Sequence, residues 1–441
     1  MLLFALLIIA GCGPGDAPSA PVPDGGAEEP VVDVSGEPAS MVIDSYSSQT
    51  IGVAGSGAAS SSIITFSLQD EAGEAVADST PVTFTISPIL GGGEKLSATE
   101  ATTKDGKVSV ALSAGTVSGT VGVTAAYHDA ETNTTISSEA KVTIVSGLAA
   151  NEQLGMAVQY FNLAGGRTFG LQDEITVYLG DRYGNVVPDG TPVSFMSEGG
   201  TIGTSDGFVS TTVFGVAQAT LQTSNPTAPD LGGVAGSVLG NPGLCRIVAY
   251  TPGDEGFNDI NGNNVFDAGK DVLTQDLSEP YIDANDNDAY DAGEKYIDSD
   301  ENGAFTPADG QYQSNVLIWT SANVLFSDDQ DFIDLQPINF NLAAGGSQAF
   351  SYFLGDIWGN SLVGGTQVAV TTTSGSLSGD TSFTVADSNG LEQQYFFTLT
   401  MPNPIPAGVS SIEVKVTVTP PSGGDVGANS GGPVSQSALG L

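Results

Sequence analysis

The sequence predicts an all-β protein built from three repeated units. Its composition is rich in turn-forming residues, with 58 Gly, and only 14% of its residues are charged. Short runs alternate between apolar and polar residues, the pattern of strands that bury one face. A segment of 21 residues recurs three times without a gap. At 441 residues the chain is too long for one ordinary domain, so we expect two to four domains.

The recurring segment predicts two strands joined by a fixed turn. Its copies are ITFSLQDEAGEAVADSTPVTF at 64–84, ITVYLGDRYGNVVPDGTPVSF at 175–195 and FSYFLGDIWGNSLVGGTQVAV at 350–370. Each copy starts with apolar-polar alternation, and a turn at Gly184-Asn185 or its equivalent follows, where Gly and Asn accept positive φ. Because a fixed turn between two half-buried strands is a packing device, we expect the shared Asp and Gly to be structural.

The pattern D-x-x-G-N-x-V-x-x-G-T-x-V-x-F at 181–195 resembles the bacterial immunoglobulin-like (Ig-like) domains of the invasin and intimin type. In that family the pattern marks two adjacent strands of a β-sandwich. The family's later G-T-V-x-V-T-A strand is matched at 119–125, is degenerate at 246–250, and is reduced to 412–416 in the third copy. The resemblance implies three tandem Ig-like β-sandwich domains and a role in adhesion, although this fold also serves stalks and enzyme appendages.

The N-terminus predicts export and a lipid anchor. Residues 2–10 form an apolar run that is too short to span a bilayer but suits a signal peptide. The following Ile9-Ala10-Gly11-Cys12 resembles the lipobox of bacterial lipoproteins, which implies that Cys12 is lipidated and becomes the mature N-terminus. With Gly13 rather than Asp after the cysteine, the resemblance implies the outer membrane of a Gram-negative cell. No Lys or Arg precedes the apolar run, and a plain secretory signal remains the alternative.

Repeat spacing predicts an insertion in the second domain. The aspartates shared by the repeats are 111 residues apart between Asp70 and Asp181 but 175 apart between Asp181 and Asp356, an excess of 64. We expect these additional residues to form an insertion between two hairpin strands at one end of the sandwich, where they disturb the core least. The predicted organisation is a signal peptide and lipobox at 1–12, a disordered tether at 13–38, Ig-like domain 1 at 39–146, domain 2 at 147–327 with an acidic insertion at 251–315, domain 3 at 328–420 and a disordered tail at 421–441.

The insertion predicts calcium-binding loops. Between Asp254 and Asp309 the chain has sixteen Asp and Glu against two Lys, with oxygen-bearing side chains at alternate positions. A tight loop can turn such side chains onto one Ca²⁺, which takes about six to eight oxygens. The loops resemble the calcium repeats of dockerins and extracellular proteins, and a solvated acidic loop or a Mg²⁺ or Mn²⁺ site are the alternatives. The candidate ligands are Asp259, Asn261, Asn263 and Asp267 in the first loop, Asp283, Asn285, Asn287, Asp291 and Glu294 in the second, and Asp298, Asp300, Asn302 and Asp309 in the third.

Lys270 of the first loop stands where a bidentate carboxylate is expected, so this loop is either the weakest site or borrows a ligand such as Asp271. The loops carry aromatic residues three positions after a ligand, at Phe266, Tyr290 and Phe305, and we expect these rings to pack the loops together. Nothing around the loops indicates flanking amphipathic helices, so a helix-opening switch is not expected.

The net charge of −41 argues against nucleic acid as a partner. No catalytic residues are predicted, since His128 has no nucleophile beside it and Cys245 lies in an apolar stretch typical of a buried thiol. The leading hypothesis is a lipid-anchored structural or adhesion protein of the cell envelope, periplasmic or surface-exposed, that presents a surface to a protein or glycan. The alternative is a carbohydrate-binding or enzyme-associated module in a larger assembly, with Trp319 and Trp358 stacking on sugar. The sequence leaves the oligomeric state open.

Overall fold

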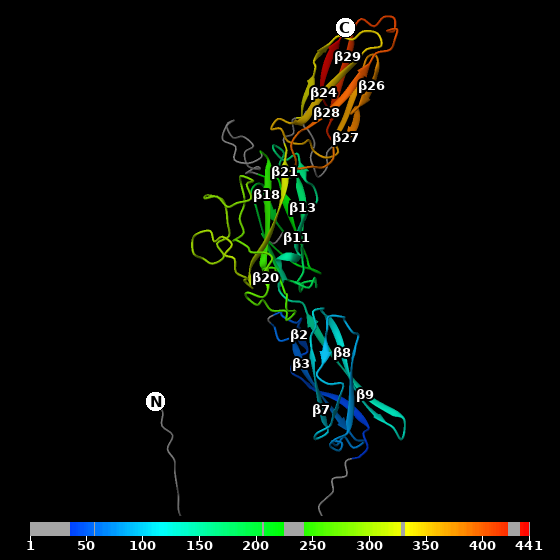
Figure 1. The fold of residues 1–441 in the computed structure, drawn as a ribbon, viewed down its shortest axis with the longest axis vertical. Helices are drawn as coiled ribbons and strands as arrows, with labels where there is room; N and C mark the ends of the chain where they lie inside the picture. The colour runs from blue at the N-terminus through cyan, green and yellow to red at the C-terminus, as the bar shows by residue number, and fades with distance from the viewer. Residues whose placement is uncertain are drawn as a thin grey trace, which may run out of the picture.

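The computed structural model describes residues 36–56, 58–204, 207–224, 242–327, 331–421 and 433–440. Within these ranges the chain forms thirty strands and one short 3-10 helix, η1 (Asn151–Gln153). The strands gather into three sandwiches that follow one another along the long axis of the molecule (Figure 1). The described residues contain no helix with the length and apolar character needed to cross a membrane. The predicted Cys12 and its apolar run lie outside the described residues.

Domain 1 is a two-sheet sandwich. One sheet has the order β1-β3-β7-β5 and the other β2-β9-β8-β4-β6. Its strands are β1 (Ser40–Tyr46), β2 (Thr50–Gly52), β3 (Ser61–Gln69), β4 (Pro81–Ser87), β5 (Lys95–Leu96), β6 (Glu100–Thr102), β7 (Lys107–Ser113), β8 (Gly119–Asp129) and β9 (Thr134–Val145).

Domain 2 repeats this order as β11-β13-β17-β15 and β12-β21-β18-β14-β16, with β10 added beside β18. Its strands are β10 (Ala149–Ala150), β11 (Leu154–Val158), β12 (Asn162–Leu163), β13 (Gln172–Leu179), β14 (Pro192–Ser197), β15 (Thr201–Gly203), β16 (Val209–Thr211), β17 (Val216–Gln222), β18 (Leu244–Asp254) and β21 (Val316–Phe326). Between β18 and β21 lies the acidic insertion, in which β19 (Phe257–Asn258) and β20 (Val272–Leu273) form a separate two-stranded ribbon.

Domain 3 has the same order again, β22-β24-β28-β26 and β23-β30-β29-β25-β27. Its strands are β22 (Asp331–Gln336), β23 (Asn339–Phe340), β24 (Ser347–Asp356), β25 (Gln367–Thr372), β26 (Ser376–Gly379), β27 (Ser382–Thr384), β28 (Gln393–Thr400), β29 (Ile412–Thr419) and β30 (Val434–Gly440).

The last strand corrects the disordered tail expected at 421–441. β30 pairs with β29 along its length and with β23 at its end, and it buries Ala438 completely. Low sequence complexity concealed it, because VSQSALG has only small and polar residues around its few apolar ones. One face of a strand in a sandwich needs only small apolar residues when the opposite sheet supplies the bulk.

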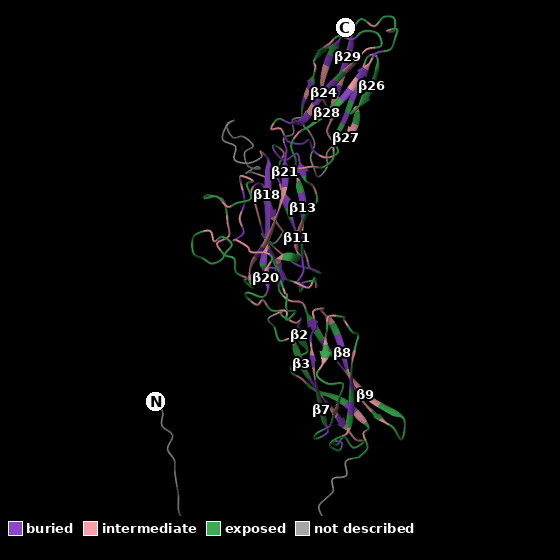
Figure 2. Ribbon diagram, viewed as in Figure 1, coloured by how far each residue is buried: buried purple, intermediate pink, exposed green. Residues whose placement is uncertain are grey.

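The repeated alternation forms the three cores. In domain 1, Ile64, Phe66 and Leu68 of β3 are fully buried, and the corresponding residues of β13 and β24 are at most 4% exposed. Figure 2 shows these buried faces running through each sandwich, while much of the insertion is exposed or half-buried. The fold prediction of three tandem Ig-like β-sandwiches with an insertion in the second is therefore confirmed by topology and burial.

Candidate metal centre

The insertion takes the place of a hairpin turn. In domain 1 the strands β8 and β9 are joined by a short turn after Asp129, whereas in domain 2 the equivalent β18 and β21 are joined by residues 255–315. Three acid-rich loops occupy this segment, which we number loop 1 (259–271), loop 2 (283–294) and loop 3 (298–306). Because β18 and β21 pair from Leu244 to Gly253, they hold the two ends of the insertion side by side.

Loop 2 brings its five predicted ligands into one turn. The Asp283 carboxylate, only 1% exposed, accepts the backbone N–H groups of Asn287 and Asp288 at 3.1 and 2.8 Å. Asp291 accepts the side-chain amides of Asn285 and Asn287 at 2.8 and 2.7 Å. The two Glu294 oxygens accept the backbone N–H groups of the second and ninth loop residues, each at 2.8 Å. The carboxylates of loop 2 therefore hold its turn through hydrogen bonds from backbone N–H groups and from the two asparagine amides.

Loop 1 follows the same design with one change. Asp267 accepts the side-chain amides of Asn261 and Asn263, as Asp291 does in loop 2. Asp259 accepts backbone N–H groups of the fourth and sixth residues at 2.7 and 2.6 Å. Asp271 bonds the N–H groups of the second and ninth residues at 2.9 and 2.7 Å, the role that Glu294 has in loop 2. The carboxylate missing at Lys270 is thus supplied one residue later.

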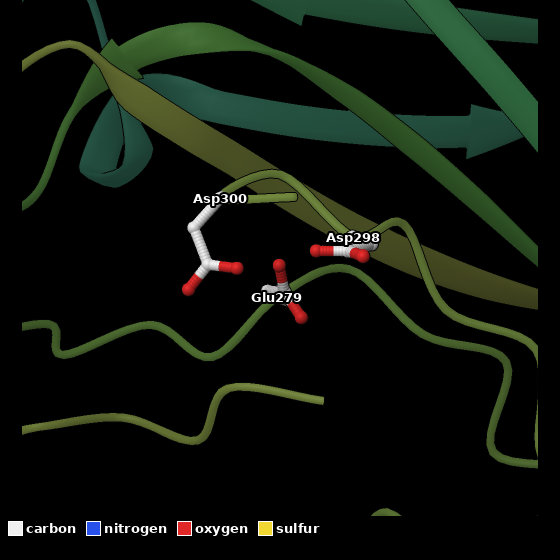
Figure 3. A group of neighbouring side chains, drawn as sticks. All are labelled: Glu279, Asp298 and Asp300. Carbon is white, nitrogen blue, oxygen red and sulfur yellow. The ribbon is translucent and has the colours of Figure 1, made fainter. Parts of the chain in front are cut away.

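Loop 3 takes its last carboxylate from outside the loop. Glu279, buried at 6% exposure, accepts the N–H groups of the second and ninth residues, Ser299 and Thr306, at 2.5 and 3.0 Å. One oxygen each from Glu279, Asp298 and Asp300 lie within 4.8 Å of one another (Figure 3). In the described parts of the chain this is the one group of three acidic, His or Cys side chains that converges so closely.

The sequence also predicts Asn302 and Asp309 as ligands of the third loop. Asn302 lies in the loop, with its side-chain amide 2.8 Å from Asp300. Asp309, expected at the twelfth place, instead accepts hydrogen bonds from Gln311 N and Gln313 Nε2 at 2.8 and 2.9 Å. Sequence spacing missed Glu279 because this residue precedes the loop by nineteen positions. A calcium-loop motif starts at its first ligand and includes only residues that follow it. No sequence signal marked Glu279, because its burial and its position beside loop 3 follow from how the chain folds back.

The donor set fits a hard cation. Hydrogen bonds from Asn285 and Asn287 lower the pKa of Asp291, those from Asn261 and Asn263 lower the pKa of Asp267, and one from Thr306 lowers the pKa of Asp300. These carboxylates are therefore ionised at neutral pH. The Oδ1 atom of Asn285 is buried without a hydrogen-bond partner. Rotating such an amide by half a turn exchanges its nitrogen and oxygen, which would present Oδ1 toward Asp291 as a cation ligand.

Aromatic rings hold loops 2 and 3 together, as predicted for two of the three aromatic positions. Tyr290 stacks on Phe305 with ring centroids 3.8 Å apart, and Tyr296 packs edge-on against both. Tyr281 continues the cluster to Trp319 of β21, whose indole N–H bonds the Ser278 carbonyl at 2.9 Å. Trp319 thus has a structural role under the insertion.

Arg246 of β18 fixes loop 2 to the sandwich. Its Nη2 lies 3.3 Å from Asp283 and 3.5 Å from Asp286, and its side chain is only 13% exposed. This guanidinium offsets part of the carboxylate charge where the loop meets the sheet.

Loop 1 packs separately and touches domain 1. Phe266 stacks on Tyr312 and meets Phe257 edge-on, and the Arg182 guanidinium lies 3.6 Å from the Phe257 ring centre. A Cβ on Gly55 of domain 1 would overlap the backbone carbonyl of Asn264 in loop 1. The aromatic cluster predicted to join all three loops is therefore two clusters, one of them beside the joint between domains 1 and 2.

The other singled-out residues have structural surroundings. Cys245 is fully buried, and desolvation raises the pKa of its thiol to about 12, which suits an inert thiol. His128 is exposed on β8 and contacts Thr135 at 3.2 Å. Trp358 lies half-buried in the repeated turn of domain 3.

No protein-family model matches the chain, and a search of curated proteins gives no match. Solved structures similar to it include the adhesin FdeC of Escherichia coli, at 16% identity and a TM-score of 0.39, over 92% of this chain and 99% of that one. The D0-D1 domain of intimin is 20% identical over 47% of this chain and 90% of its own, with a TM-score of 0.20. Invasin, described as a bacterial integrin-binding protein, is 16% identical over 91% of this chain and 60% of its own, with a TM-score of 0.28. At these values the likenesses carry no argument about function.

Proposed function

We propose that the chain is a lipid-anchored structural or adhesion protein of the cell envelope, whose tandem Ig-like domains space or present an interaction surface. In this proposal Ca²⁺ bound in loops 1 to 3 stiffens the insertion of domain 2. The adhesion role is what the resemblance of the repeated D-x-x-G-N segments implies, and a protein or glycan on another surface would be the ligand.

The observation that carries the calcium part is the common hydrogen-bond design of the loops. In each, a carboxylate reached from a different chain position bonds the second and ninth N–H groups: Asp271, Glu294 and Glu279. In an acidic segment that is only solvated, three carboxylates at different sequence positions would not be expected to bond the same two N–H groups of their loops. The packed carboxylates repel one another, and a bound divalent cation would offset that repulsion.

Calorimetric titration of the metal-stripped full chain with Ca²⁺ tests the proposal. We expect saturable binding of two or three ions, with a site lost in Asp283→Ala and another in Asp298→Ala. Asp129→Ala is the matched control, because Asp129 also accepts a backbone N–H at 2.8 Å in a tight turn but lies outside the insertion. Absence of binding to the parent chain, or an equal loss in the control, would overturn the calcium part.

A further inference from the structure

The aspartate of the repeated turn fixes the turn in all three domains and, in domains 1 and 2, also the segment that precedes the domain. Asp181 Oδ1 accepts the backbone N–H groups of Tyr183 and Asn185, each at 2.9 Å, and Oδ2 accepts that of Gly147, between domains 1 and 2, at 3.0 Å. Asp70 makes the equivalent bonds in domain 1, including one from Gly36 at 3.1 Å. Asp356 caps the turn of domain 3 in the same way. The turn itself is therefore common to all three domains.

The asparagine of the turn reaches into the preceding domain. Asn185 donates from Nδ2 to the Thr116 carbonyl at 2.8 Å and accepts from the Ser118 N–H at 3.0 Å, both in domain 1. The second hydrogen of Nδ2 bonds Asp181 at 2.8 Å, which orients the amide. Its donors and its acceptor are thus all used, two of the three contacts crossing between domains.

The second joint is built alike. Asn360, 1% exposed, donates from Nδ2 to the Pro242 carbonyl of domain 2 at 2.8 Å and to Asp356 at 3.1 Å. Pro242 stands just before β18, as 116–118 stands just before the equivalent strand β8 of domain 1. Each asparagine therefore binds the same loop of the domain before it.

Neighbouring contacts reinforce each joint. The Tyr183 hydroxyl donates to the Ala54 carbonyl of domain 1 at 3.0 Å. At the second joint Asn162 donates to the Ser361 carbonyl at 2.8 Å, and Asn389 to the Asn323 carbonyl at 3.0 Å. Side-chain amides bonded to main-chain groups at both joints fix the distance and the rotation between neighbouring domains.

Domain 1 provides the internal comparison. Its turn is D-E-A-G-E, with Glu74 at the place of Asn185 and Asn360, and residues 71–75 are all exposed. A glutamate carboxylate has no N–H to donate to a carbonyl. The turn forms without the amide, so the turn does not require asparagine at this place. From this comparison we infer that Asn185 and Asn360 fix the orientation of each Ig-like domain relative to the one before it. Each asparagine binds the loop that precedes the β8-type strand of the preceding domain, so the three domains form one rigid, extended unit.

Substituting each asparagine in the full chain tests this inference, which is independent of metal. Asn185→Ala and Asn360→Ala remove the amide, Asn185→Glu copies the turn of domain 1, and Glu74→Asn is the control in an exposed turn. We expect the exchange rate of the Ser118 amide to rise about tenfold in both Asn185 variants, since its acceptor is lost or displaced. X-ray scattering should show a shorter maximum dimension and a flexible-chain profile for the Asn185→Ala/Asn360→Ala double variant, with the control unchanged.

Thermal unfolding distinguishes whether the asparagines act between domains or stabilise the turn of their own domain. The melting transition of each domain should stay close to that of the parent in the asparagine variants, whereas Asp181→Ala should lower that of domain 2. The inference is overturned if Ser118 exchange and scattering match the parent, if Glu74→Asn changes scattering equally, or if Asn185→Ala destabilises domain 2 as much as Asp181→Ala does.

Discussion

A buried carboxylate at the start of β13 gives the most quantitative prediction. Asp173 is fully buried, its Oδ1 accepts the Tyr160 N–H at 3.0 Å, and its Oδ2 has no hydrogen-bond partner. Desolvation raises the pKa of Asp173 from 3.8 to about 6, the Tyr160 N–H opposes this, and the Asp387 carboxylate of domain 3 adds to it. At neutral pH the native chain therefore carries a buried, partly unpaired negative charge.

Replacing Asp173 by Asn removes this charge and keeps the acceptor for Tyr160. A rise of about two pKa units corresponds to about 3 kcal/mol, at 1.36 kcal/mol per unit, and relaxation around the charge makes about 1–3 kcal/mol the expected gain. Because the folded pKa lies above the unfolded one, the native state favours the protonated form. The penalty is thus absent below pH 4, grows between pH 4 and 6, and is complete above pH 6.

Hydrogen exchange of the β13 amides in increasing urea measures this stability for domain 2 alone. At pH 7.5 Asp173→Asn should be more stable than the parent, and at pH 4 the difference should nearly vanish. Asp189→Asn is the control, because Asp189 also accepts a backbone N–H, from Phe214 at 2.7 Å, but is exposed. A gain that is equal at both pH values, or a loss of stability at pH 7.5, would refute the reasoning.

Three further predictions concern the insertion. Glu279→Gln should weaken one Ca²⁺ site at least about tenfold in calorimetry, whereas Asp309→Asn should leave the titration unchanged; the reverse result would restore Asp309 as the ligand. For a site with a dissociation constant of about 10⁻⁴–10⁻³ M, 10 mM Ca²⁺ should stabilise domain 2 by about 1.4–2.7 kcal/mol, so chelator should lower its melting midpoint by several degrees, and an unchanged midpoint would contradict metal stiffening. Tyr290→Ala removes the ring stacked on Phe305 and should speed limited proteolysis between loops 2 and 3, with Tyr178→Ala, an exposed ring on β13, as the control.

Period-two alternation was enough to predict the fold, because a sandwich strand must bury every second side chain. Phe66, Val177 and Tyr352 all lie in cores as that rule requires. The turn was predicted only in part: Gly73, Gly184 and Gly359 adopt positive φ, at 81°, 77° and 83°, while Asn185 does not share that conformation. The Asn185 amide instead bonds residues of domain 1, and such a contact between domains cannot be predicted from the residues of the turn alone.

The candidate site shows a similar limit. Ligand spacing inside loop 2 named the three carboxylates that bond the loop's own backbone and amides, Asp283, Asp291 and Glu294, because that loop closes on itself. In loop 1 the closing carboxylate is Asp271, one residue past the twelfth place and anticipated only because Lys270 occupies that place. In loop 3 it is Glu279, which precedes the loop and was not anticipated. Such partners are set by how the chain folds back, and a motif with fixed spacing cannot include them. β30 was missed for a related reason, since its pairing with β29 and β23 supplies the order that its composition lacks.

In each sandwich a short strand near the start of the domain pairs in parallel with the last strand: Thr50 with Thr143, Asn162 with Leu325, and Asn339 with Leu439. During synthesis no domain can therefore complete its sheet until nearly all of its residues have left the ribosome. Domain 2 must wait for the whole insertion to emerge, so β18 stays without its partner β21 while some sixty residues are added. For domain 3 the wait lasts until 434–440 are made, and a polypeptide cut short at 420 would leave β29 as an open edge, prone to pair with other chains.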